Sequence, residues 1–186
     1  MNGLLYAFIA CFLAGCGARD QVLVAALTDR LGPRFSLLAI ACITGGLTCA
    51  LAAYFAQDLA GVMNHRARLL LASFALAAAG VESLLVSPGR RAKEPTRSLF
   101  AALLVLAISQ IVDAARFIVL AIALLHAPLL AALGGTLGGG AAITIGWFGA
   151  GPLLAAERHL RLARRLAGAI LLLSGVTLGW TTLGVL

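Results

Sequence analysis

Ser109-Gln110-Ile111-Val112-Asp113-Ala114-Ala115-Arg116 places a carboxylate and a guanidinium near the middle of an apolar run from about Leu99 to Leu125. A run of that length is sufficient to cross the hydrocarbon core of a bilayer. A charged residue at such a depth costs roughly 2.5–3.5 kcal/mol on insertion scales, so it persists when it is paired or serves a polar site. A second stretch, Gly17-Ala18-Arg19-Asp20-Gln21-Val22, carries the same two kinds of charge near the N-terminus. We therefore expect an intramembrane Asp/Arg stretch in each half of the chain to carry the function.

The composition is that of a protein whose solvent is lipid. The chain has 186 residues, of which 62% are hydrophobic and 11% charged, with a mean hydropathy of +1.04; a soluble domain would carry about 25% charged residues. The net charge of +7 would favour nucleic acid in a soluble chain, but here the basic residues gather in short connections, as the positive-inside rule predicts. We expect an integral membrane protein with the lipid bilayer, and not nucleic acid, as its partner.

Six apolar segments can be read, at about residues 4–27, 35–55, 69–86, 98–125, 129–154 and 166–186. The connections after the first, third and fifth segments hold ten of the 14 basic residues, whereas those on the other side hold only Arg66 and Arg68. Basic connections stay in the cytoplasm, so both termini are expected outside it. The excess of Arg over Lys hints at a bacterial source, which makes the inner membrane the expected location. The prediction is an all-α polytopic membrane protein with six transmembrane helices.

The two halves resemble repeats. A shift of about 93 positions aligns similar residues in the two halves: Asp20 with Asp113, Gly45-Gly46 with Gly138-Gly139, Tyr54-Phe55-Ala56 with Trp147-Phe148-Gly149 and, after a small length change, Gly80-Val81 with Gly175-Val176. Three crossings per half make the second half enter from the opposite face, as in the inverted repeats of secondary transporters. Residues 1–86 are the predicted first repeat, 87–97 a cytoplasmic polar linker and 98–186 the second repeat. Chance similarity between Ala-, Leu- and Gly-rich helices is the alternative.

Asp20 and Asp113 are the first candidates for a site. Carboxylates suit hard cations, and a carboxyl group in a medium of low dielectric exchanges protons more readily near neutral pH. Gln110 lies three residues before Asp113 and can offer a neutral ligand oxygen or a hydrogen bond to another helix. The alternative is charge cancellation, in which Arg116 pairs with Asp113 at i,i+3 and Arg19 pairs with an Asp of either half.

Several other polar residues are given structural roles. Glu82, at the end of the third segment, is expected to be solvated at the membrane interface. The four cysteines, all in apolar runs without Cys-x-x-Cys spacing, are expected to be buried free thiols. The stretch 134–140, with five glycines, is expected to allow close helix packing. Leu13-Ala14-Gly15-Cys16 resembles a lipoprotein cleavage box, but Met1-Asn2-Gly3 has no basic residue, so no cleavage is expected.

The two acidic stretches resemble the Gdt-type family of small six-helix membrane transporters, which includes the Golgi manganese and calcium–proton exchangers. The family signature is Glu-x-Gly-Asp-Lys/Arg-Ser/Thr, once per repeat; Asp20 and Asp113 match its Asp. Gln110 stands at the position of the Glu, and Arg19 at that of the Gly. The resemblance implies antiport of a divalent cation, Mn2+ or Ca2+, against protons, with Asp20 and Asp113 as metal ligands and Gln110 as a neutral ligand.

Two other functions stay open at this stage. Arg19 and Arg116 beside the carboxylates also suit an exporter of a small organic zwitterion or anion. A collapsed site of internal ion pairs would instead make the chain a non-transporting membrane accessory protein. No Ser/His/Asp, Cys/His or zinc constellation is visible, so no enzyme and no cofactor is expected, and the sequence leaves homo-oligomer formation open.

Overall fold

The computed structural model describes residues 2–85 and 99–184, and this part of the chain forms nine α-helices and no strand. In chain order the helices are α1 (Asn2–Gly15), α2 (Arg19–Leu31), α3 (Phe35–Val62), α4 (His65–Leu85), α5 (Leu99–Ile111), α6 (Ala114–Leu125), α7 (Pro128–Phe148), α8 (Ala150–Ala155) and α9 (Glu157–Leu183). The predicted all-α class is confirmed. The predicted linker at 87–97 lies outside the described residues.

Four of these helices, α3, α4, α7 and α9, are each long and apolar enough to cross a membrane. Two further pairs pass the same test together but are bent: α1 with α2 by 56°, and Leu103–Ile111 of α5 with α6 by 53°. Counting each bent pair as one span gives six, the number of apolar segments in the sequence. The described helices are therefore compatible with an integral membrane protein, with four helices, or up to six, that could cross a membrane.

Both bends lie at the charged stretches that the sequence singles out. In the first pair, α1 ends at Gly15 and Gly17 adopts φ = 78°, a left-handed conformation that glycine reaches without steric cost. In the second pair, α5 ends at Ile111 and Asp113 caps the start of α6. Each Asp therefore lies at the beginning of the second helix of a bent pair.

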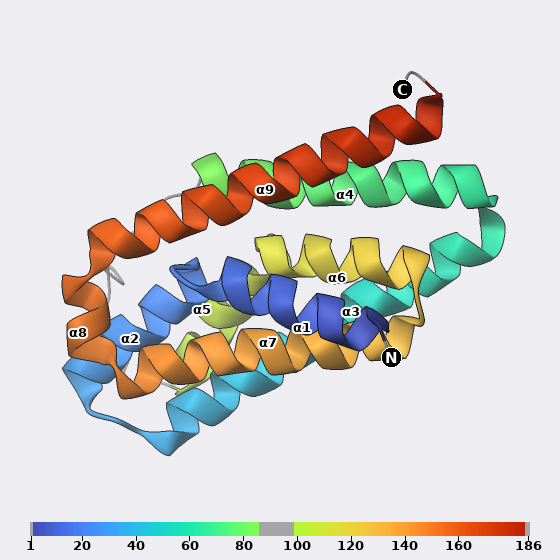
Figure 1. Ribbon diagram of the computed structural model, residues 1–186. Coiled ribbons are helices and arrows are strands. Elements are labelled where there is room, and N and C mark those ends of the chain that lie inside the picture. Colours follow the sequence, from blue (N-terminus) through green and yellow to red (C-terminus); the bar gives the residue numbers. More distant parts are fainter. Residues whose placement is uncertain (1, 86–98, 185–186) are drawn as a thin grey trace.

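Three of the helix boundaries repeat along the chain with the same shift of about 93 positions. This shift carries the start of α3 onto the start of α7, the end of α3 onto the end of α8, and the start of α4 to within a residue of the start of α9. Figure 1 shows both termini at one end of the bundle, together with the α3–α4 and α6–α7 turns.

Several helices extend beyond the apolar segments of the sequence. The polar stretch 56–62 continues α3, and α9 begins at Glu157 instead of near residue 166. Hydropathy marks where lipid contact ends, whereas the helix continues as long as good helix formers follow, here Ala, Leu, Glu and Arg. The early start of α9 brings Arg164 into a helix that packs on α4.

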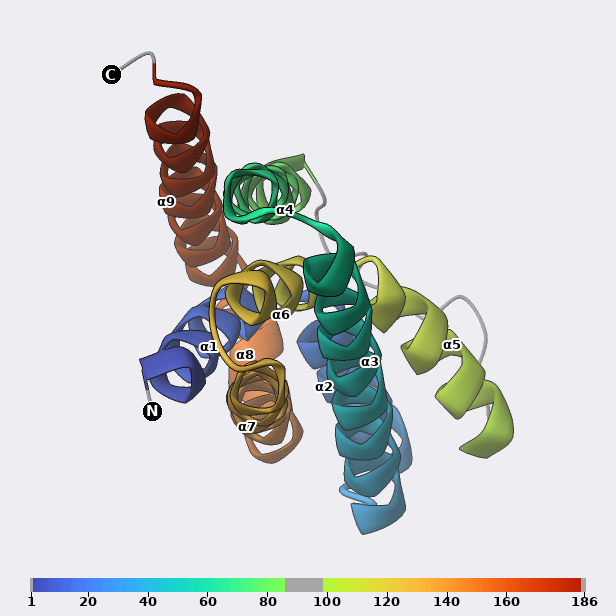
Figure 2. The same ribbon diagram turned by 90° about the vertical axis from the view of Figure 1, so that its right-hand side faces the viewer.

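Small residues hold the helices close together. A Cβ atom at Gly138 would collide with the carbonyl oxygen of Phe8 on α1, and one at Gly80 would lie 2.6 Å from the backbone nitrogen of Leu172 on α9. Close packing through the glycine-rich stretch of α7 is therefore as expected. Figure 2 shows α4 and α9 side by side at the edge of the bundle, with α6 between α4 and the core helices.

Candidate functional site

Asp20 lies in the first turn of α2 and is 5% exposed. Its Oδ1 accepts a hydrogen bond from the backbone N–H of Gln21 at 2.8 Å. The N-terminus of a helix carries partial positive charge, which favours a carboxylate at this position. No ion pair joins Asp20 to a basic side chain in the described part of the chain; it interacts electrostatically, from farther away, with Asp113, Arg116 and Arg164.

Gln21 fixes the first break and is a residue that the sequence did not single out. Its Oε1 accepts from the backbone N–H of Gly17 at 2.7 Å, and its Nε2 donates to the carbonyl of Ala142 on α7 at 2.7 Å. A side chain that is 1% exposed thus replaces hydrogen bonds that the interrupted helix loses. Gln21 positions the turn that presents Asp20.

Asp113 is the N-cap of α6, and its side chain accepts from the backbone N–H of Ala115 at 3.4 Å. Gln110, at the end of α5, donates from Nε2 to Oδ2 of Asp20 at 3.5 Å and to the carbonyl of Ala41 at 3.4 Å. The structure therefore brings together the predicted site residues Asp20, Gln110 and Asp113 at the meeting point of the two broken spans. Oε1 of Gln110 and Oδ1 of Asp113 are buried without a hydrogen-bond partner.

Arg116 pairs with Asp113 as the i,i+3 spacing predicts, with Nη1 and Oδ2 3.4 Å apart. Its Nε also donates to Oγ1 of Thr48 on α3 at 2.9 Å. The side chain is 7% exposed, so this guanidinium is held between two helices inside the bundle.

Arg164 and Glu82 complete the cluster, and neither was predicted to belong to it. Nη2 of Arg164 lies 2.8 and 2.6 Å from the two carboxylate oxygens of Glu82 and 3.7 Å from Oδ1 of Asp113. The expectation that Glu82 is solvated is wrong, because its side chain is only 9% exposed and is paired with an arginine from the end of the chain. No spacing rule predicts this pair from the sequence, since 82 residues separate its members.

Arg19 does not take the place predicted for it. It is exposed at the first position of α2, and its charge acts on Glu82. Neighbouring residues of a helix point about 100° apart, so burying Asp20 turns Arg19 outward. Arg164, and not Arg19, is the second arginine beside Asp113.

The buried cluster carries one unbalanced negative charge when all its members are ionised. It contains three acidic residues, Asp20, Glu82 and Asp113, and two arginines, Arg116 and Arg164. Asp20 is the acid without an arginine partner, so the excess charge is centred on it.

A cavity of about 10 Å³ adjoins Asp20, lined also by Arg116 and by Gly135, Thr136 and Gly139 of α7. This volume corresponds to about one water molecule. Among the described residues no group of three His, Cys, Asp or Glu is arranged so that it could hold a metal ion. The four cysteines are free; Cys11 and Cys49 are buried, while Cys16 and Cys42 are partly exposed.

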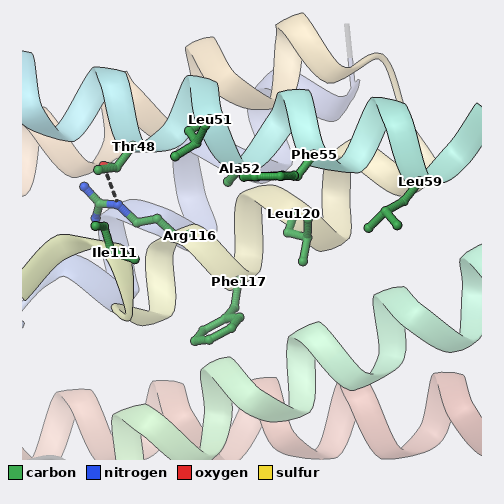
Figure 3. A pocket seen from close by; sticks show the side chains of 9 residues that line it. All are labelled: Thr48, Leu51, Ala52, Phe55, Leu59, Ile111, Arg116, Phe117 and Leu120. Atoms are coloured by element: carbon green, nitrogen blue, oxygen red, sulfur yellow. Dashed lines mark hydrogen bonds between the residues drawn. The ribbon is translucent and has the colours of Figure 1, made fainter. Parts of the chain in front are cut away.

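A groove of about 290 Å³ runs between α3 and α6 (Figure 3). Arg116 and Thr48 form one end of it, and its walls are apolar, from Phe55 and Phe117 to Leu59 at the other end.

The comparisons with known proteins add no relative to this description. No protein-family model, no curated protein and no solved structure matches the chain.

Proposed function

We propose that this protein is a secondary membrane transporter of the bacterial inner membrane, built from two inverted three-helix repeats with both termini outside the cytoplasm. The single observation that carries the proposal is the position of Asp20 and Asp113, each at the start of the second half of a broken span. Interrupted spans that meet near the middle of the bundle are the usual frame of a transport site.

The repeated helix boundaries support the two-repeat reading. Chance similarity of composition would align Ala- and Gly-rich segments, but it would not also align helix starts, helix ends and two bends of 56° and 53°. Both termini lie at the same end of the bundle, which agrees with an even number of spans. The α2–α3 connection, which is flanked by Arg30 and Arg34, lies at the opposite end and supports a cytoplasmic location for that end.

The charge of the cluster supports exchange of a cation against a proton. One proton bound at Asp20 neutralises the net charge of −1 of the buried cluster, and a divalent cation bound there changes it to +1. Asp20 is held by a backbone N–H and by Gln110, both neutral groups, so its carboxylate is free to bind a proton and to release it. The resemblance to the Gdt-type family adds Mn2+ or Ca2+ as the cation to test first, with Asp20, Gln110 and Asp113 as its ligands.

An exporter of a small organic anion or zwitterion is the second candidate, favoured by the arginine at the inner end of an apolar groove. The third candidate is an accessory protein with a collapsed site. It is favoured by the contact of Nη2 of Arg164 with both carboxylate oxygens of Glu82 and by the small size of the cavity beside Asp20.

Transport in cells that lack their own manganese exporter separates these candidates. We expect the wild type to lower cellular Mn2+ and Asp20→Asn to abolish the effect while reaching the membrane at the same level. Asp58→Asn is the matched control, because Asp58 is an exposed acid on α3. If the wild type changes neither Mn2+ nor Ca2+, cation exchange is refuted, and organic anions supplied to proteoliposomes decide between the two remaining candidates.

A further inference from the structure

Arg116 lines both the groove between α3 and α6 and the cavity beside Asp20, and it is the one residue that these two linings share. The guanidinium therefore forms part of the wall between a surface groove of about 290 Å³ and a buried cavity of about 10 Å³. Figure 3 shows Arg116 reaching across the end of the groove to Thr48.

Few contacts hold this wall in place. Nε of Arg116 donates to Thr48 at 2.9 Å, and Nη1 approaches Asp113, on its own helix, at 3.4 Å. Gly45 leaves room for the head group, because a Cβ atom there would already lie 3.6 Å from Nη2. The Thr48 hydroxyl is thus the hydrogen-bond partner that ties the guanidinium to α3, and the groove beside it has space for a displaced arginine side chain.

We propose that Arg116 is the gate of a lateral path to Asp20: when its guanidinium leaves Thr48 and turns into the groove, the cavity and the groove become continuous. From Thr48 to Leu59 the groove follows α3 for about 16 Å at 1.5 Å per residue, toward the end of the bundle that holds both termini. Its apolar walls suit a small organic molecule with an apolar body, and they exclude a hydrated ion.

A native thiol reports whether the path opens. Cys49 lines the cavity and is 2% exposed, so a neutral reagent reaches it after the wall has opened. The test uses the full-length chain in proteoliposomes with Cys11, Cys16 and Cys42 replaced by Ala, and it measures the rate at which N-ethylmaleimide modifies Cys49.

Thr48→Val removes the hydroxyl and keeps the shape of the side chain. We expect this variant to be modified roughly tenfold faster or more, the factor that follows from losing one hydrogen bond to a charged group. Thr48→Ser, which keeps the hydroxyl, should react at the unsubstituted rate. Thr44→Val is the matched control one turn earlier on α3, because the Thr44 hydroxyl donates to carbonyls of its own helix, those of Ile40 and Ala41, at 2.8 and 3.1 Å.

The gate is refuted if N-ethylmaleimide modifies Cys49 at an unchanged rate in Thr48→Val, or if Thr44→Val raises this rate by the same factor. The purpose of the gate rests on the second candidate function, export of a small organic anion or zwitterion, but this experiment measures access to a thiol and no flux. The two experiments can therefore fail separately. If transport is absent but Thr48→Val still speeds the modification of Cys49, the transport function is refuted and the gate is not. If transport is present but the rate of modification is unchanged, the gate is refuted and the transport function is not.

Discussion

Replacing Arg164 by Met tests whether the buried cluster is held together by this residue. Arg164 is 2% exposed and contacts both oxygens of Glu82, with Asp113 3.7 Å away. Removing one partner of a buried pair costs about 3–5 kcal/mol, because the opposite charge stays buried without compensation. In this variant the net charge of the cluster changes from −1 to −2. We expect Arg164→Met to lower the free energy of unfolding by about 3–5 kcal/mol.

The assay is reversible unfolding in mixed detergent micelles, followed by circular dichroism. Arg66→Met is the control, because Arg66 also joins α4 to α9, through carbonyls of Thr182 and Leu183 at 2.9 and 3.2 Å, but at an exposed position. Its expected cost is about 1 kcal/mol or less.

A double variant makes the test specific for charge. Glu82→Leu combined with Arg164→Met restores a sum of one negative charge, so it should be more stable than Arg164→Met alone, by roughly 1–3 kcal/mol. Should Arg164→Met cost no more than Arg66→Met, or should the double variant be less stable than Arg164→Met, the electrostatic account of the cluster is wrong.

Two further predictions concern packing and the first break. Gly138→Ala should destabilise the protein by about 1–3 kcal/mol, since a Cβ atom there meets the Phe8 carbonyl. Gly139→Ala is the control and should be tolerated, because no atom lies within 4 Å of its Cβ position. Thermal unfolding in detergent compares the two variants, and equal midpoints would contradict the packing. Gln21→Leu should lower the free energy of unfolding by about 2–4 kcal/mol, because it leaves the buried N–H of Gly17 and the buried carbonyl of Ala142 unpaired. Gln57→Leu, at an exposed site on α3, is the control and should cost less than about 0.5 kcal/mol. Chemical unfolding measures both variants, and similar losses of stability would refute the role of Gln21.

The sequence was sufficient for features that depend on composition and local spacing. Hydropathy predicted an all-helical membrane protein, and the cost of burying charge in an apolar run pointed to the residues where both spans break. The Arg116–Asp113 pair followed from its i,i+3 spacing. The contact between Gln110 and Asp20 agrees with the expectation that the two halves meet at a common site.

The missing members of the cluster depend on tertiary packing. Arg164 lies between two apolar segments, so hydropathy predicts a polar connection there. Hydropathy does not show that this stretch is the first part of α9 and packs on α4. Glu82 was placed in water because its arginine partner was not visible. For Arg19 the sequence identified the charge, but the direction of the side chain depends on where α2 begins after the break. The resemblance to the Gdt-type family stays a prediction.

The unbalanced negative charge of the cluster makes the proposed cycle sensitive to voltage. With one proton bound, the cluster is neutral, and its reorientation across the membrane does not sense the potential. With a divalent cation bound, the cluster carries one positive charge, whose transfer across the membrane is worth about 2.3 kcal/mol per 100 mV. An inside-negative potential therefore opposes the outward movement of the cation-loaded site, and depolarisation should speed cation export by such an exchanger.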